Sequence, residues 1–154
     1  MFHEEGKTMP TVAQVSALAL KYLAPLGAEM DEDGDICVDQ DGTLCYVSVE
    51  EFGKQIKQGN DILVKIYAPM VWDVPRTAAL YKWVATEAQI DYLCRVACNE
   101  NHDEDPKLTD IYLEHGMFGD NMQAEELISS VAYMIAVVNL SYSDIHEAFG
   151  GTLE

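Results

Sequence analysis

The sequence predicts an α+β fold in which an antiparallel sheet of about five to six strands carries three helices packed on one face, in the order α-β-β-β-(β)-α-β-β-α. Three segments repeat apolar residues at the spacing of a helix, and the segments between them alternate apolar with polar residues as strands do. Two Asp-Gly pairs join the early alternating runs, and such pairs are strong local signals for hairpins. Because most of these strands follow one another directly in the chain, they are expected to pair antiparallel.

The first helix is expected to open at Pro10 or Thr11 and to end near residues 25–27. Proline suits the first turn of a helix, where its missing N–H would have no intrahelical acceptor. Three short antiparallel strands are expected to begin near Ala28, with Asp-Gly turns at residues 33–34 and 41–42 between them. A long strand then starts at Ile62, and Pro69 is expected to bend or end it.

The second half of the chain predicts a helix, two strands and a final helix. Pro75 is expected to be the first residue of the second helix, with Asp73 just before it. Residues 92–98 and 108–119 alternate as strands on either side of a charged loop. Asn121 is expected to cap the last helix, and residues 141–154 follow it as the end of the chain. The apolar stripe of that helix consists of Leu127, Val131, Met134, Ile135 and Val138.

A length of 154 residues suits one domain, which we expect at residues 10–151 between an N-terminal tail, 1–9, and a C-terminal tail, 152–154. The longest apolar stretch, residues 127–140, is too short to span a bilayer and contains serines and an asparagine. The N-terminus lacks the layout of a signal peptide, so a cytoplasmic location is expected. The four cysteines form no C-x-x-C pair and are expected to be reduced core residues.

The net charge is the most unusual property of the composition. Asp and Glu number 27 against 9 Lys and Arg, which gives a formal net charge of −18. Such a surface repels phosphate backbones and anionic lipids, so nucleic acid and membrane surfaces are disfavoured as partners. A basic peptide or a basic protein surface would be attracted. The alternative is that the charge serves solubility alone.

The stretch DQDGTL, residues 39–44, resembles the nucleophile loop of the haloacid-dehalogenase-like phosphatases. In that family the loop ends a strand of a parallel sheet, because crossover helices bring the other catalytic groups to the same edge. Here the stretch lies between two hairpin strands, and no later lysine or acidic pair stands in a recognisable setting. We therefore interpret DQDGTL as a tight hairpin turn and keep the phosphatase as the minor alternative.

No other catalytic or metal-binding pattern stands out. The acidic run DEDGD, residues 31–35, has the wrong glycine position for a calcium loop. The four histidines are scattered, and no Ser-His-Asp or Cys-His set is evident. We expect no catalytic residue, no cofactor and no metal, and therefore not an enzyme.

Several stretches in a fixed order resemble the YbjN and TY-Chap group of peptide-binding chaperones, which has a type III secretion chaperone-like fold. The stretches are LAPLGAEMDEDGDICV, YAPMVWDVP, LTDIYLEHGMFGDNMQAEELISSVAYMIAVV and DIHEAFGG, and the resemblance that they carry covers residues 10–151. The resemblance implies a non-enzymatic, dimeric module that holds a partner polypeptide on its sheet face or sheet edge. Some members of the group are described as regulators, so a regulatory interaction protein without a chaperone role is the second alternative.

Large aromatic side chains and methionine suit adaptable protein-binding surfaces. The candidates cluster around the end of the long strand, at Tyr67, Met70 and Trp72, and on the open side of the sheet, at Tyr46 and Tyr112. The alternative is that Tyr67 and Trp72 belong to the core or to a dimer interface.

Overall fold

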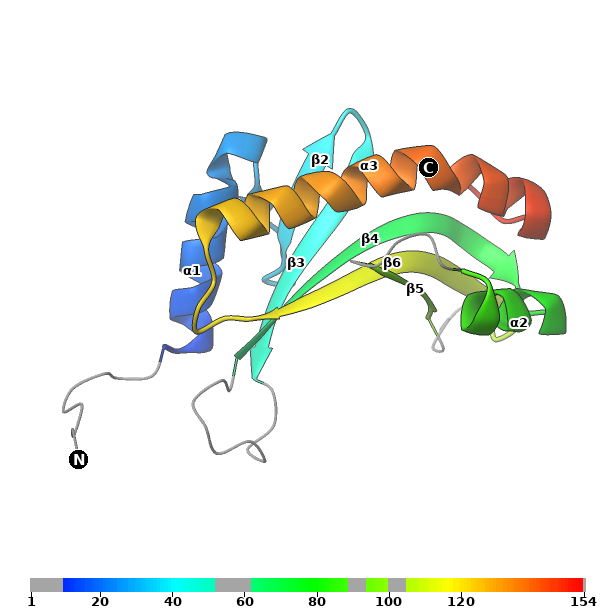
Figure 1. Cartoon of the computed structure of the whole chain (residues 1–154), viewed down its shortest axis with the longest axis horizontal. Coiled ribbons are helices and arrows are strands. Elements are labelled where there is room, and N and C mark those ends of the chain that lie inside the picture. The colour runs from blue at the N-terminus through cyan, green and yellow to red at the C-terminus, as the bar shows by residue number, and fades with distance from the viewer. Residues whose placement is uncertain (1–9, 52–61, 89–93, 100–104, 154) are drawn as a thin grey trace.

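The computed structural model describes residues 10–51, 62–88, 94–99 and 105–153. These residues form three helices and one sheet of six strands, all antiparallel, in the order β1-β2-β3-β4-β6-β5 (Figure 1). The predicted fold class and element order are confirmed. The elements are α1 (Val12–Leu23), a short 3-10 turn (Ala24–Leu26), β1 (Glu29–Met30), β2 (Ile36–Gln40), β3 (Thr43–Glu51), β4 (Ile62–Pro75), α2 (Ala78–Thr86), β5 (Arg95–Cys98), β6 (Leu108–Phe118) and α3 (Ala124–Phe149).

The helix boundaries follow from local hydrogen bonds. Thr11 caps α1, since its hydroxyl accepts from the N–H of Gln14 and the Gln14 side chain accepts from the N–H of Thr11. The predicted start at Pro75 is wrong, because Pro75 is the last residue of β4 and Thr77 caps α2 through the N–H of Leu80 at 3.1 Å. A proline can end a strand at a position where no N–H has to be donated.

The cap of α3 also differs from the expectation. Gln123, not Asn121, occupies the capping position, and its side chain makes no capping hydrogen bond. The helix continues to Phe149 rather than ending before Ser141, where the final segment of the chain was expected to begin. Its additional turns keep an apolar inner side through Ile145, which is 3% exposed, and through Phe149, whose ring lies 5.2 Å from the ring of Trp83 on α2. These contacts with the rest of the molecule extend the helix beyond its first apolar stripe.

The core lies between one face of the sheet and the helices. The helix α3 packs on β3 and β4, and α1 packs on β3 and on α3. The helix α2 lies at the far end of the sheet, near β5 and the last turns of α3. Alternate strand residues point into this core, including Val38, Cys45, Val47, Val64, Ile66, Ile111 and Leu113, all of which are fully buried.

The stretch DQDGTL is a hairpin turn, as expected. Asp41 and Gly42 have φ of 53° and 90°, and Gln40 pairs with Thr43 across them. Both central residues therefore lie in the left-handed region that a two-residue hairpin turn requires, which is why glycine stands at the second. The strands on either side are antiparallel, unlike the parallel strands that hold a phosphatase nucleophile.

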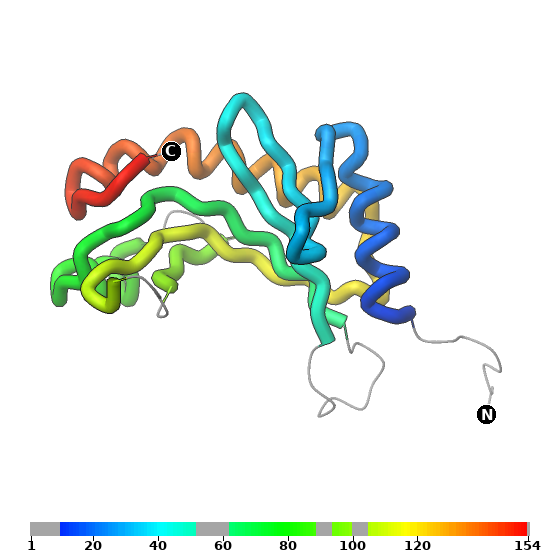
Figure 2. Tube along the Cα trace, turned by 180° about the vertical axis from the view of Figure 1, so that it is seen from behind, coloured from blue at the N-terminus to red at the C-terminus, as the bar shows by residue number. Residues whose placement is uncertain are grey.

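The sheet divides beyond the middle of β4. The pairing of β3 with β4 ends at Tyr46 and Tyr67, whereas β4 stays paired with β6 as far as Pro75. Figure 1 and Figure 2 show the β2–β3 hairpin rising away from the course of β4 and β6. Two side-chain contacts hold the hairpin toward the helices: Thr43 Oγ1 donates to Asn139 Oδ1 of α3 at 2.6 Å, and Gln40 Nε2 donates to Leu26 O at 3.1 Å.

Candidate functional site

The face of the sheet that points away from α1 and α3 is called the open face. One row of paired residues crosses it from edge to edge and uses every strand of the sheet. The row consists of Glu29, Cys37, Tyr46, Tyr67, Glu114 and Arg95. It therefore combines two tyrosines in the middle with charged residues toward both edges.

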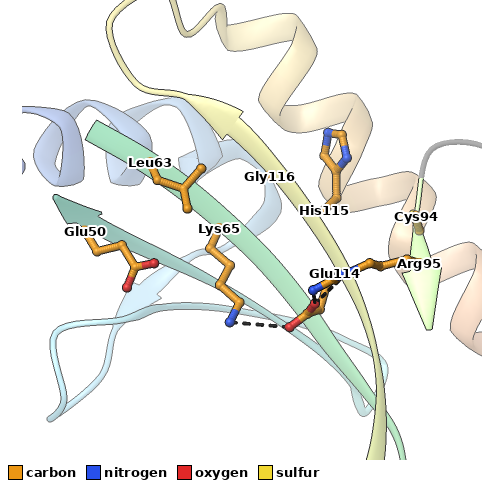
Figure 3. A pocket seen from close by; sticks show the side chains of 8 residues that line it. All are labelled: Glu50, Leu63, Lys65, Cys94, Arg95, Glu114, His115 and Gly116. Carbon is orange, nitrogen blue, oxygen red and sulfur yellow. Dashed lines mark hydrogen bonds and ion pairs between the residues drawn. The ribbon is translucent and has the colours of Figure 1, made fainter. Parts of the chain in front are cut away.

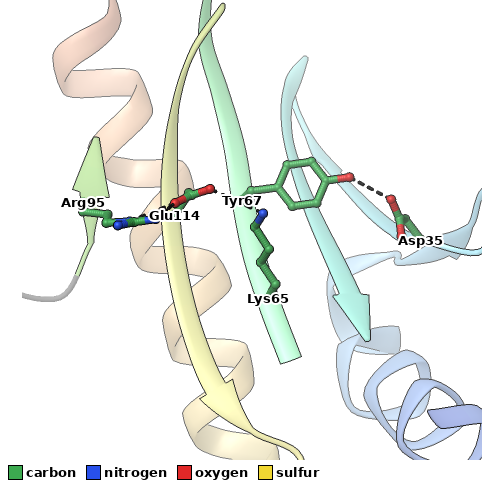
Figure 4. Close-up of polar contacts among 5 residues, drawn as sticks. All are labelled: Asp35, Lys65, Tyr67, Arg95 and Glu114. Carbon is green, nitrogen blue, oxygen red and sulfur yellow. Dashed lines mark hydrogen bonds and ion pairs between the residues drawn. The ribbon is translucent and has the colours of Figure 1, made fainter. Parts of the chain in front are cut away.

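The two tyrosines form a stacked pair. The rings of Tyr46 and Tyr67 lie 5.2 Å apart between centroids, at 15° to each other. Tyr67 Oη donates to Asp35 Oδ2 at 2.8 Å (Figure 4). Burial raises the pKa of Tyr67 far above its ordinary value of 10, and the hydrogen bond to Asp35 raises it further. The phenol therefore stays protonated over the physiological range, and the hydrogen bond holds the ring in one orientation.

Glu114 is at the centre of a second polar group. Its Oε2 accepts from Arg95 Nε at 2.8 Å and Nη2 at 2.6 Å, and its Oε1 lies 3.4 Å from Lys65 Nζ (Figure 4). Burial raises the pKa of Glu114, but the hydrogen bond from Arg95 and the charges of Lys65 and Arg95 outweigh it, so that the pKa lies below 4.5. The side chain of Arg95 is 79% exposed, so a partner can reach its guanidinium.

Replacing Glu114 with Gln is expected to lower the melting temperature by a few degrees at pH 7. Because the folded-state pKa of Glu114 is depressed, its ionised form stabilises the folded protein above the unfolded-state pKa, and this stabilisation is lost as the pH falls through the folded-state value. The difference between the variant and the wild type should therefore close below about pH 4.5. Thermal unfolding followed by circular dichroism between pH 3 and 7 measures it. The matched control is Glu50→Gln, at an exposed position near the same group, and a gap that does not depend on pH would contradict this account.

Two hollows lie on the open face. The first, of about 500 Å³, is lined by Lys65, Arg95, Glu114, Leu63 and Glu50, among others (Figure 3). Gly116 also lines it, and its missing side chain helps to leave this part of the face recessed. The second hollow, of about 250 Å³, is lined by Lys65, Tyr67, Pro69, Trp72, Asn99, Asp110 and Tyr112.

The structure brings four of the five predicted residues together. Tyr67, Trp72 and Tyr112 line the second hollow, and Tyr46 stacks on Tyr67 beside it. Met70 lies apart from them, since it is 4% exposed and belongs to the core. It lines a third cavity together with Trp72, on the side of β4 where the sheet divides. That these residues bind a partner stays a prediction.

Sequence reasoning missed the charged members of the face. Lys65, Arg95 and Glu114 come from three strands, and their meeting depends on β6 lying between β4 and β5. A signal was present for Glu114, because it alternates with the buried Ile111 and Leu113 on the same side as Tyr112. No such signal identifies Asp35 as the acceptor for Tyr67.

Two further properties of the described residues concern metal binding and membrane insertion. Among the described residues, no group of three or more His, Cys, Asp or Glu side chains is arranged to hold a metal ion. Among the described helices, α3 is the one long and apolar enough to cross a membrane, by length and composition alone. The core helix of a soluble protein has the same properties, and the inner side of α3 packs on β3 and β4.

Together, the antiparallel sheet, the covering helices and the order of elements define the class of secretion-chaperone-like α+β proteins. The chain belongs to the TY-Chap1 family, described as type III secretion (YopN, CesT) and YbjN peptide-binding chaperone 1, whose model matches residues 11–154. The resemblance noted in the sequence is thereby confirmed. No curated protein sequence matches the chain.

The fold is shared by solved structures, among them YbjN and the ExsC–ExsE complex. The crystal structure of YbjN from E. coli has a TM-score of 0.58 at 11% identity, and the match covers 94% of this chain and 99% of that one. The crystal structure of the ExsC–ExsE complex has a TM-score of 0.54 at 12% identity, with 88% and 96% covered. At these identities the likeness establishes the fold and not a shared partner.

Proposed function

We propose that the chain is a non-enzymatic chaperone-like module that binds a partner polypeptide on the open face, around Tyr46, Tyr67, Trp72 and Tyr112. The observation that carries the proposal is the hollow in which three of these aromatic side chains meet beside the stacked Tyr46. Aromatic residues in a recessed site supply large contact area at low cost in conformational entropy. Membership of a peptide-binding chaperone family, and a similar protein that forms a complex with ExsE, support this function.

Charge favours a basic partner. Asp35 contacts Tyr67 directly. Burial and the neighbouring Cys37 raise the pKa of Tyr46 most, and the negative charges of Asp31 and Asp35 raise it further. A lysine or arginine of the partner that approaches the tyrosine pair would meet these carboxylates, whereas the ring of Tyr67 already stacks on Tyr46 and has Lys65 Nζ over it, 6.0 Å from its centroid. With a net charge of −18, the whole chain would also attract such a partner over a distance.

We also infer a homodimer in a cytoplasmic setting. The outer side of α3 supports the dimer: its exposed residues between Glu126 and Asp144 carry no charge, and Leu140 is 81% exposed. Two copies of an acidic chain can approach there with least repulsion. The mass of the purified protein in solution, measured by light scattering, tests the dimer.

The function is tested by capture of the partner. The tagged chain is expected to retain one stoichiometric polypeptide from the extract of its native cells, identified by mass spectrometry, and Tyr112→Ala and Trp72→Ala are expected to reduce its recovery at least about fivefold. The matched control is Tyr81→Ala, which removes an exposed tyrosine from α2, away from the open face and from the outer side of α3. Equal loss with the control, or a varied set of proteins that no variant changes, would contradict binding at the open face.

A further inference from the structure

The division of the sheet leaves a cleft of about 420 Å³ beside β4. The tip of the β2–β3 hairpin forms one wall, β4 forms the other, and α3 forms the floor. The wall of β4 contributes Pro69, Met70 and Trp72, the hairpin contributes residues 41–44, and α3 contributes Val138, Asn139 and Tyr142. Because the hairpin is tied to α3 through Thr43 and Asn139, β3 does not close this gap.

The chain's own C-terminal segment already binds there as a strand. Trp72 N donates to Thr152 O at 2.9 Å, and Thr152 N donates to Trp72 O at 2.7 Å. These two hydrogen bonds form an antiparallel bridge, and Trp72 is one of the residues that the irregular pairing of β4 with β6 skips, together with Met70 and Asp73. The backbone of Trp72 therefore points away from β6, where an added strand can reach it. Leu153 lines the cleft next to the bridge.

Gly151 shows how closely that segment approaches. Its φ is +93°, and a Cβ at this position would lie 2.5 Å from Trp72 O, 2.7 Å from Val71 Cγ1 and 2.9 Å from Val74 Cγ2. A larger residue is excluded both by this contact with the backbone and by the left-handed conformation. The cleft therefore accepts a segment with glycine opposite the Trp72 carbonyl, then a residue that pairs with Trp72 through its backbone N–H and C=O, and an aliphatic residue after it.

We propose that this cleft is a strand-accepting site for an extended segment of the partner polypeptide, and that residues 151–153 are its intramolecular competitor. The inference rests on the proposed function, since the same partner polypeptide would bind the open face and, with another segment, this cleft beside β4. Backbone pairing with Trp72 supplies the binding mode, and the position of Leu153 supplies a site for an aliphatic side chain. Trp72 also lines the hollow on the open face, so one partner chain can run from the cleft onto that face.

Few contacts hold the C-terminal segment in the cleft, so a segment of the partner can replace it. The bridge is a single pair of residues, and Leu153 is 37% exposed even when bound. A tethered segment of this kind competes as though present at roughly millimolar concentration. A partner segment bound elsewhere on the same molecule gains a similar effective concentration and can displace it.

The test uses the full-length chain with Gly151→Val, which is expected to release the C-terminal segment through the contact with Trp72 O. Amide hydrogen exchange at Trp72 should become at least about tenfold faster than in the wild type. Thr152→Val is the matched control, since it changes an exposed side chain and keeps the backbone hydrogen bonds. If Gly151→Val does not fold, Thr152→Pro replaces it, because proline lacks the N–H that donates to Trp72 O.

The acetylated peptide GGTLE is then titrated to about 5 mM and followed by NMR, because one bridge binds weakly. The released variant should show saturable shifts at Trp72 at a peptide concentration about tenfold lower than the wild type requires. Unchanged exchange at Trp72, no saturable shift in the released variant, or equal binding by the wild type would overturn the proposal. None of these results depends on capture at the open face, so failure here leaves the outcome with Tyr112→Ala, which lines the open-face hollow and not the cleft, as a separate test of the proposed function.

Discussion

Replacing Leu113 with Ala is expected to lower the free energy of unfolding by about 2–5 kcal/mol. Leu113 is fully buried on β6, where it pairs with Ala68 on β4 and with Val96 on β5. Alanine leaves a cavity that the neighbouring strands cannot fill, because their backbones are fixed by pairing on both sides of β6. Denaturant unfolding followed by circular dichroism measures the loss.

A matched change on the same strand separates burial from strand propensity. Phe118 ends β6 and is 50% exposed, so Phe118→Ala is expected to cost less than about 1 kcal/mol. If the two variants lost equal stability, Leu113 would not lie in the main core, and the assignment of the open face would be reversed. The comparison thus tests which side of the sheet the helices cover.

Replacing Tyr67 with Ala is expected to weaken binding of the captured partner at least about thirtyfold, which corresponds to roughly 2 kcal/mol. The change removes the ring that stacks on Tyr46, the wall of the second hollow and the hydroxyl that holds Asp35. Such central, oriented aromatic residues dominate the energetics of protein interfaces. Isothermal titration calorimetry with the purified partner measures the change.

Tyr67→Phe is the informative companion, since it keeps the stacked ring and removes only the hydrogen bond to Asp35. It should therefore weaken binding much less than Tyr67→Ala. Both variants must unfold with the same midpoint as the wild type or be corrected for the difference. Full affinity in a folded Tyr67→Ala protein would place the partner away from the stacked pair.

Most of the fold could be predicted because its signals are local. The Asp-Gly turns require left-handed φ, the apolar spacing of α1 identifies its inner side, and the alternation in β6 separates Ile111 and Leu113 from Tyr112. The errors fall where contacts between residues far apart in the sequence determine the ends of helices and strands. Pro75 remains in β4 because it pairs with Leu108, and the last turns of α3 are extended by packing such as that of Phe149 on Trp83.

The site was predictable in part for the same reason. Tyr46, Tyr67 and Tyr112 share a face because of the two-residue period of strands, which is visible in the sequence. Met70 lies three residues after Tyr67 on the same strand, so the two-residue period places its side chain on the opposite face, in the core. The pairing of β4 with β6 is irregular after Pro69, so the face on which Trp72 lies does not follow from simple alternation along the strand. A register shift of this kind has no clear sequence signature. The predicted strand at residues 92–98 is described only from Cys94 onward, and Arg95–Cys98 confirm that part.

The central claim is that the open face holds a partner polypeptide, and site-specific photo-crosslinking in the native cells tests it most directly. A photoreactive phenylalanine replaces Tyr112 on the open face in one variant and the exposed Tyr81 on α2 in the other. The account predicts one discrete adduct from position 112, identified by mass spectrometry as the polypeptide that the tagged chain captures. Adducts from position 81 alone, or none from position 112 in a folded protein, would contradict it.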